Sequence, residues 1–275
     1  MTKELKLAFI GGGNMASALA SGLIGKRCGA ADVHVIDPYP PTLEGWAQRG
    51  VSTASEAGPE LARHDVWIFA VKPQSMKDAV AACRPFLGPD TLVVSIAAGV
   101  RADTVAAWLG DGQPHTRLVR CMPNTPALIG EGVSGLMALS GVSADDKAVA
   151  EQLLRAVGEV VWVDDDAAID AVTALSGSGP AYVFLFLEAL IAAAVGQGLD
   201  PGQARTLALG TLRGATQLAA LSPETPAQLR ERVTSKGGTT AAALQVFREA
   251  GFESIVERAM AAARDRAAAM AAEFH

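Results

Sequence analysis

The chain has 275 residues, of which 50% are hydrophobic and 19% charged, so it is long enough for two folded domains and is neither disordered nor fibrous. Its net charge of −6 gives no electrostatic reason to expect nucleic acid or an anionic membrane surface as a partner. The 3 cysteines are unclustered and the 4 histidines lack ligand spacing, which argues against a disulfide framework and against a metal site. We expect no metal.

The first residues lead straight into a strand-like run and show no signal-peptide pattern. The longest apolar stretch, from Ala181 to Gly196, contains Glu188 and is shorter than the roughly 20 residues that a membrane span needs. We therefore expect a cytoplasmic protein with no membrane partner.

The most informative stretch is a glycine-rich turn between an apolar β-prone run and a helical pattern near the N-terminus. Gly11, Gly13 and Ala16 fit G-x-G-x-x-A, in which the first glycine permits the turn, the second lets a pyrophosphate approach the backbone, and the third small residue packs helix on strand. A second strand-like run, 33–36, ends on Asp37, where an acid would bond the hydroxyls of a ribose. The pattern predicts a dinucleotide site, and a purely structural glycine turn is the alternative.

Strand-like and helical segments alternate through the first 126 residues. We expect strands at 65–71, 91–96 and 118–120 and a further strand starting at Val51. We expect helices at 42–49 and 76–87, and another helix whose last residues are 61–64. This alternation predicts an α/β fold with an N-terminal doubly wound, Rossmann-like sheet. Ligands gather beyond the carboxyl ends of such strands, so one cleft should be bordered by the turns at Gly11, Val71, Ala97 and Met122.

The second half of the chain is rich in alanine and predicts an all-α domain. Helices are expected at 178–196, 201–221, 226–233, 240–249 and 253–272. We place the boundary at the acidic triplet 164–166, giving a dinucleotide-binding domain at 1–164 and a helical substrate-binding and dimerisation domain at 165–275. The triplet is interpreted as a solvated loop that supplies a helix N-cap rather than as a cation site.

Two features of the helical half bear on ligands and partners. Residues 233–241 place hydroxyls, a lysine and a Gly-Gly turn before a helix, which fits a receptor for a small carboxylate and equally fits a simple N-cap. The helix at 181–195 is apolar on every side and must be covered on every side, which predicts an obligate dimer.

Six motifs, in order along the chain, resemble those of the pyrroline-5-carboxylate reductase family. They are residues 9–16, 70–74, 95–100, 122–126, 176–182 and 233–240. The resemblance implies reduction of L-1-pyrroline-5-carboxylate to L-proline by NADPH or NADH, the last step of proline biosynthesis. It also implies a homodimer joined through the helical domains and often assembled further into a ring.

The resemblance also assigns roles to individual residues. A cofactor would be bound by Gly11, Gly12, Gly13, Asn14, Met15, Ala16, Asp37, Ala70, Val71, Lys72, Pro73, Ala97 and Asn124. The substrate would be bound by Ser235, Gly237, Gly238, Thr239 and Thr240, with the Thr240 hydroxyl bonded to the ring nitrogen as the catalytic contact. Lys72 is expected to contact the cofactor rather than to donate a proton. Lys236 stands where the family usually has proline, so the rigidity of this loop is open.

Two alternatives and one preference remain open. A β-hydroxyacid dehydrogenase would need an asparagine four residues after its catalytic lysine, but Thr240 follows Lys236 at that distance. A non-catalytic dinucleotide-binding protein would not need the 235–240 loop. Asp37 favours NADH whereas the family commonly accepts NADPH, so we expect both cofactors to be used.

Overall fold

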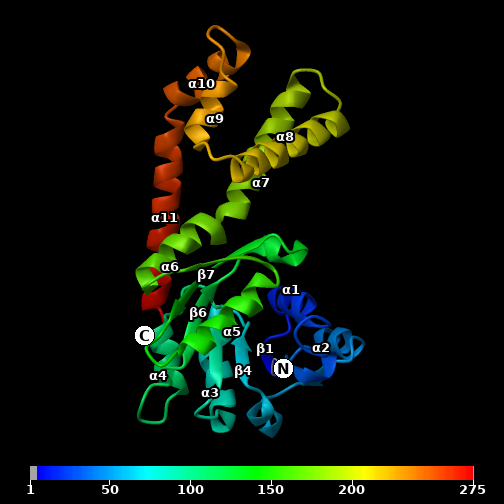
Figure 1. The fold of residues 1–275 in the computed structure, drawn as a ribbon, viewed down its shortest axis with the longest axis vertical. Coiled ribbons are helices and arrows are strands. Elements are labelled where there is room, and N and C mark those ends of the chain that lie inside the picture. Colours follow the sequence, from blue (N-terminus) through cyan, green and yellow to red (C-terminus); the bar gives the residue numbers. More distant parts are fainter. Residues whose placement is uncertain (1–4, 275) are drawn as a thin grey trace. The chain divides into compact units, whose positions relative to one another are not determined.

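A computed structural model describes residues 5–274 (Figure 1). The chain forms two compact units. The first runs through Ser178 and takes up the chain again from Ala263, and the second is Gly179–Ala262.

The first unit is built on an eight-stranded sheet with the order β3-β2-β1-β4-β5-β6-β7-β8. Strands β1 to β6 are parallel, β7 pairs antiparallel with β6, and β8 pairs parallel with β7. The strands are β1 (Leu7–Ile10), β2 (Val33–Ile36), β3 (Ser52–Ala54), β4 (Val66–Phe69), β5 (Leu92–Ser95), β6 (Leu118–Met122), β7 (Gly132–Ala138) and β8 (Gly158–Trp162). The order 3-2-1-4-5-6 is that of dinucleotide-binding sheets, which confirms the predicted doubly wound domain.

Helices cover both faces of this sheet, because its parallel strands are apolar on both sides. One face packs against α1 (Asn14–Leu23), α2 (Pro40–Ala47) and α5 (Ala144–Arg155), which contribute Leu19, Trp46 and Leu153. The other face packs against α3 (Met76–Cys83), α4 (Ala102–Leu109) and α6 (Asp166–Val172), which contribute Val80, Val105 and Ile169. Two separate apolar cores thus hold the strand ends in place.

The second unit is entirely helical. It contains α7 (Gly179–Gly196), α8 (Pro201–Leu221), α9 (Pro226–Arg232), α10 (Thr239–Glu249) and the first half of α11 (Phe252–Ala272). Pro201 and Pro226 stand in the first turns of their helices, as predicted, because a missing N–H costs nothing there. Three aromatic rings contact one another, with centroids 6.5 Å apart for Phe186 and Phe247 and 5.5 Å for Phe247 and Phe252.

Several sequence predictions are corrected by the structure. The helix predicted to close at 61–64 is only a 3-10 turn, Pro59–Arg63, and a second 3-10 turn, Arg84–Phe86, ends the helix predicted at 76–87. The sequence analysis missed α4, α5, β7 and β8. The first compact unit extends through Ser178, because α6 buries Ile169 in its core, and the domain boundary at residue 164 stays a prediction.

The acidic triplet behaves only in part as predicted. Asp165 is the N-cap of α6 and accepts a hydrogen bond from the N–H of Ala168 at 2.7 Å. Asp166 is not solvated, because its carboxylate pairs with the buried guanidinium of Arg120. Arg120 also pairs with Asp170 at 3.3 Å, so the two acids fasten α6 to β6. The pKa of Asp170 is raised, chiefly by burial.

Candidate functional site

The glycine turn after β1 requires glycine at its first two positions. Gly11 has φ +97°, and a Cβ there would lie 2.7 Å from the carbonyl oxygen of Ala70. A Cβ on Gly12 would lie 2.8 Å from the ring nitrogen of Trp46, whose N–H donates to the Gly12 carbonyl at 2.9 Å. The turn therefore packs against the residue that follows β4 on one side and is hydrogen-bonded to Trp46 of α2 on the other.

Gly13 has a different reason to be glycine. Its φ of −72° suits any residue, and nothing lies within 4 Å of the position that a Cβ would take. The N–H groups of residues 13–16 have no acceptor within residues 5–274, and α1 has no side-chain cap. Open space beside a glycine at an uncapped helix N-terminus fits a pyrophosphate, which would fill that space and accept those N–H groups. Ala16 is fully buried, as the third small residue of the motif should be.

Asp37 follows β2 and lies beside this turn. One carboxylate oxygen accepts the N–H of Gly12 at 2.8 Å and the other accepts the N–H of Tyr39 at 2.9 Å. Its carboxylate is thereby fixed next to the segment that would hold a pyrophosphate.

The other predicted cofactor residues follow neighbouring strands. Ala70, Val71, Lys72 and Pro73 come after β4, and Ala97 comes after β5. Because β1, β4 and β5 are adjacent and parallel, these turns share one edge of the sheet with Gly11, as predicted. Lys72 is exposed, and its ammonium has no ion-pair partner in the described part of the chain.

Asn124 has a structural role that the sequence did not reveal. Its side chain is buried, accepts the N–H of Val133 on β7 at 2.9 Å, and donates to the carbonyl of Ser176 at 3.0 Å. That carbonyl would ordinarily pair with the N–H four residues on, but Pro180 has none. Ser176 lies in a π-helical turn, Thr173–Gly177, so Asn124 satisfies the carbonyl that this irregular turn and the proline leave open.

The predicted substrate residues lie in the second unit, at the start of α10. The N-cap is Gly238 and no side chain caps the helix, so the N-cap interpretation of Thr240 is wrong. The N–H groups of Thr239, Thr240 and Ala241, and the hydroxyls of Ser235, Thr239 and Thr240, have no hydrogen-bond partner within residues 5–274. Gly237 has φ +74°, which turns the loop tightly toward the helix. The end of α10 therefore offers a cluster of unused donors, the composition of a carboxylate receptor.

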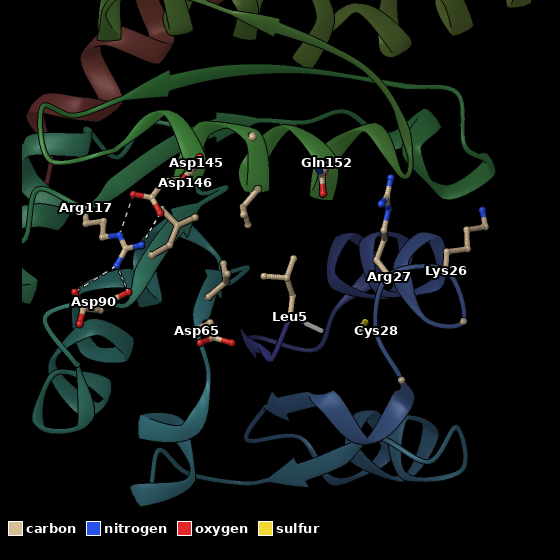
Figure 2. Close-up of a pocket in the computed structure, with 16 residues that line it drawn as sticks. Leu5, Lys26, Arg27, Cys28, Asp65, Asp90, Arg117, Asp145, Asp146 and Gln152 are labelled. Atoms are coloured by element: carbon tan, nitrogen blue, oxygen red, sulfur yellow. Dashed lines mark hydrogen bonds and ion pairs between the residues drawn. The ribbon is translucent and has the colours of Figure 1, made fainter. Parts of the chain in front are cut away.

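A cavity of about 1110 Å³ lies at the opposite edge of the first unit's sheet. Residues at the amino ends of the strands line it, among them Leu5, Asp65 and Leu92 (Figure 2). There the Arg117 guanidinium donates two hydrogen bonds to the Asp146 carboxylate, at 2.9 and 2.6 Å. This pairing lowers the pKa of Asp146 to about 2. The cavity is remote from Gly11 along the strands, so it is separate from the candidate cofactor site.

Comparisons with known proteins identify the family. A model described as pyrroline-5-carboxylate reductase dimerisation matches residues 166–270, and one described as NADP oxidoreductase coenzyme F420-dependent matches residues 6–99. The pyrroline-5-carboxylate reductase of Pseudomonas aeruginosa is 46% identical over 98% of both chains. Among solved structures, that of the Coxiella burnetii reductase has 36% identity and a TM-score of 0.89, covering 98% of this chain and 99% of the other. The Plasmodium falciparum reductase with NADP bound has 30% identity and a TM-score of 0.85, covering 98% of this chain and 100% of the other. The chain belongs to the pyrroline-5-carboxylate reductase family.

Membership of this family settles two matters that the sequence left open. The protein is an NAD(P)H-dependent oxidoreductase, which excludes the β-hydroxyacid dehydrogenase and the non-catalytic alternatives. Its helical half is a dimerisation domain, which confirms the expected homo-oligomer.

The dimerisation domain also accounts for an unusual helix. The continuous helical stretch Asp166–Gly196 has 31 residues and is long and apolar enough, by length and composition, to cross a membrane. It exceeds the stretch considered from sequence because α6, the π-helical turn and α7 join without a break. On α7 the side chains of Val183, Phe184 and Leu185 are more than half exposed within one chain. These apolar residues lie within the matched dimerisation domain, where a second copy of the chain would cover them.

Proposed function

We propose that this protein reduces L-1-pyrroline-5-carboxylate to L-proline, the last step of proline biosynthesis. The observation that carries the proposal is the uncapped start of α10, with its unused N–H groups and hydroxyls, in a chain that also has an uncapped dinucleotide turn at α1. The first would hold a small carboxylate and the second a pyrophosphate. The names of the relatives supply the substrate.

The chain's own residues suffice for this reaction. When bound, NAD(P)H supplies the hydride. The ring nitrogen of a protonated cyclic imine already makes the adjacent carbon electrophilic, so placement of the substrate matters more than a strong general acid. Ser235 and Thr239 would bind the carboxylate through their hydroxyls and the N–H of Thr239. Gly238, whose N–H donates to the Ser235 carbonyl at 3.1 Å, would shape the loop. The Thr240 hydroxyl would bond the ring nitrogen. The adjoining Lys236 would add a positive charge near the carboxylate.

The turns of the first unit would hold the cofactor. Residues 11–16 would bind the pyrophosphate, and Val71, Lys72, Pro73 and Ala97 would border the ribose and nicotinamide. Asn124 would border the cofactor without offering its amide, because that amide is already hydrogen-bonded to Val133 and Ser176.

One assay tests the proposal. In one set of reactions the purified protein receives L-1-pyrroline-5-carboxylate with NADH or NADPH. In a second set it receives one of a series of 3-hydroxy acids with NAD⁺ or NADP⁺. Absorbance of the reduced nicotinamide is followed in both sets. We expect turnover with pyrroline-5-carboxylate and none with the 3-hydroxy acids. Chromatography should identify proline as the product. Turnover of a 3-hydroxy acid, or none with pyrroline-5-carboxylate, would refute the proposal.

We also propose a cytoplasmic homodimer that assembles further into a ring, acting without membrane or nucleic acid partners. The exposed apolar residues of α7 support the dimer, and the resemblance supports the ring. Cys28, Cys83 and Cys121 are buried and form no disulfide in the described part of the chain, which suits a reducing compartment. Light scattering on the purified protein would give the size of the assembly.

A further inference from the structure

The carboxylate of Asp37 is held beside the glycine turn that follows β1. Its backbone N–H donates to Ala54 at 3.1 Å, and its two oxygens accept from Gly12 and Tyr39. Gly12 belongs to the turn that faces the pyrophosphate, so the carboxylate is one hydrogen bond away from that turn. A ribose joined to a pyrophosphate at that turn would therefore lie against Asp37.

The carboxylate keeps acceptor capacity for a ligand. A carboxylate has about four lone-pair sites, and backbone donors use two of them here. The remaining sites suit the 2′- and 3′-hydroxyls of a ribose, which donate hydrogen bonds. At neutral pH a 2′-phosphate is mostly without a proton, so it has little to donate to the Asp37 carboxylate. Its charge of about −1.5 to −2 would also be repelled by that carboxylate.

No cation is available on this segment to offset that repulsion. Arg49 is the sole arginine or lysine between Asp37 and Val51. Its guanidinium donates to the hydroxyls of Ser17 and Ser21 at 3.1 and 2.9 Å and lies 4.5 Å over the ring of Trp46.

We propose that Asp37 makes this enzyme selective for NADH over NADPH. The proposal narrows the sequence prediction that both nucleotides are used, and it departs from the relative whose structure holds NADP. The proposal rests on one part of the proposed function, the use of a nicotinamide nucleotide as the cofactor. Asp37 acts on affinity by accepting the ribose hydroxyls and by repelling a 2′-phosphate.

The test measures binding rather than turnover. Dissociation constants for NAD⁺ and NADP⁺ are obtained by isothermal titration calorimetry on the wild-type protein, on Asp37→Asn and Asp37→Ser, and on Asp32→Asn. Asp32 is a matched control, because its carboxylate also accepts a backbone N–H, that of Gly29 at 2.8 Å, but it precedes β2 instead of following it.

We expect the wild type to bind NAD⁺ at least about 10-fold more tightly than NADP⁺, since hydrogen bonds to charged groups each contribute about that factor or more. Both Asp37 variants should reduce this ratio by about 10-fold, and Asp32→Asn should leave it unchanged. Equal affinities in the wild type, or an unchanged ratio in the Asp37 variants, would overturn the proposal. The wild-type ratio needs no variant, so the proposal stays testable if a variant misfolds. Loss of pyrroline-5-carboxylate turnover with both nucleotides would refute the proposed function instead, without affecting the binding ratio.

Discussion

The two units of this protein differ in what holds them together. In the first, two apolar cores fill the space on either face of the sheet, and strands β1, β2, β4 and β5 are buried at every position. In the second, Ala204 and Ala208 are the only buried residues of the 179–262 range, and large side chains such as Phe184, Leu207 and Leu221 are exposed. The first unit is thus complete within one chain, whereas the second depends on a partner for its apolar burial.

The largest effect should come from a charge on the helix that lacks cover. Leu185 on α7 is 68% exposed within one chain, and we expect Leu185→Asp to abolish the homo-oligomer, because an unpaired charge buried at an apolar interface costs about 5 kcal/mol or more. Sedimentation equilibrium would show monomers. Val161→Asp on β8 is the control: it is 53% exposed in the self-sufficient unit and should change stability by less than about 0.5 kcal/mol. If the Leu185→Asp variant kept its oligomer, the second unit would not depend on a partner through α7.

A second large effect should fall on the first unit alone. Arg120→Ala would leave Asp170 without its ion-pair partner and Asp166 with only its 3.6 Å pair to Arg101, at a cost of about 3–5 kcal/mol. All 4 tryptophans lie in the first unit, so urea unfolding followed by tryptophan fluorescence reports that unit. We expect an earlier fluorescence transition with the oligomer retained at low urea. Arg155→Ala, which breaks surface pairs with Glu151 and Glu159, should leave the transition where it is.

The same contrast shows what the sequence could reveal. Periodicity located the strands through β6 and all the helices of the second unit, because burial on both faces and strong helix signals leave clear patterns. It missed β7, where Gly132 and Gly135 interrupt the strand. Those glycines are needed because a Cβ would lie 2.9 Å from the Val157 carbonyl oxygen or 2.6 Å from the Val172 side chain, contacts made by distant segments.

Prediction of the site followed the same division. The glycine turn and the α10 loop were visible because they are local combinations of residues at helix starts. The bonds of Asn124 to Ser176 and of Arg120 to Asp170 join residues 52 and 50 positions apart, and no local pattern encodes them. The dependence of α7 on a partner was also visible, since an apolar helix in a small helical domain cannot be covered by that domain.

A smaller effect should separate substrate binding from helix capping in the second unit. Because Gly238 caps α10, we expect Thr240→Ala to keep the wild-type melting temperature and to lower kcat/KM for pyrroline-5-carboxylate by roughly 10- to 150-fold, the value of one hydrogen bond to a charged group. Thr225→Ala is the matched control, since Thr225 does cap α9 and accepts the N–H of Gln228. That variant should lose about 0.5–2 kcal/mol of stability and keep its kcat/KM. The opposite pattern in the two variants would remove Thr240 from the substrate contacts.

The smallest effect should be a pH dependence confined to the first unit. His34 is buried on β2, bonds Ser52 at 2.9 Å and stacks on His64 with ring centroids 5.4 Å apart. Burial lowers the pKa of both imidazoles from the ordinary 6.5, and Lys6 opposes protonation of His64 while Glu60 favours it at both rings. Between the lowered pKa and 6.5 the unfolded chain binds more protons than the native one, so stability falls as pH drops below about 6.5 and levels off below the folded pKa.

The second unit offers the internal control for this prediction, because residues 179–262 contain no histidine. We expect the urea midpoint from tryptophan fluorescence to fall between pH 7.5 and pH 5.5. Burial also lowers the pKa of His115, so His64→Gln should reduce that fall only in part, by removing one of three such imidazoles and its repulsion of a proton on His34. Sedimentation at the same two pH values should show the same oligomer, since the contacts of α7 are apolar. A midpoint that rises on acidification would mean that the two histidines are protonated in the native fold.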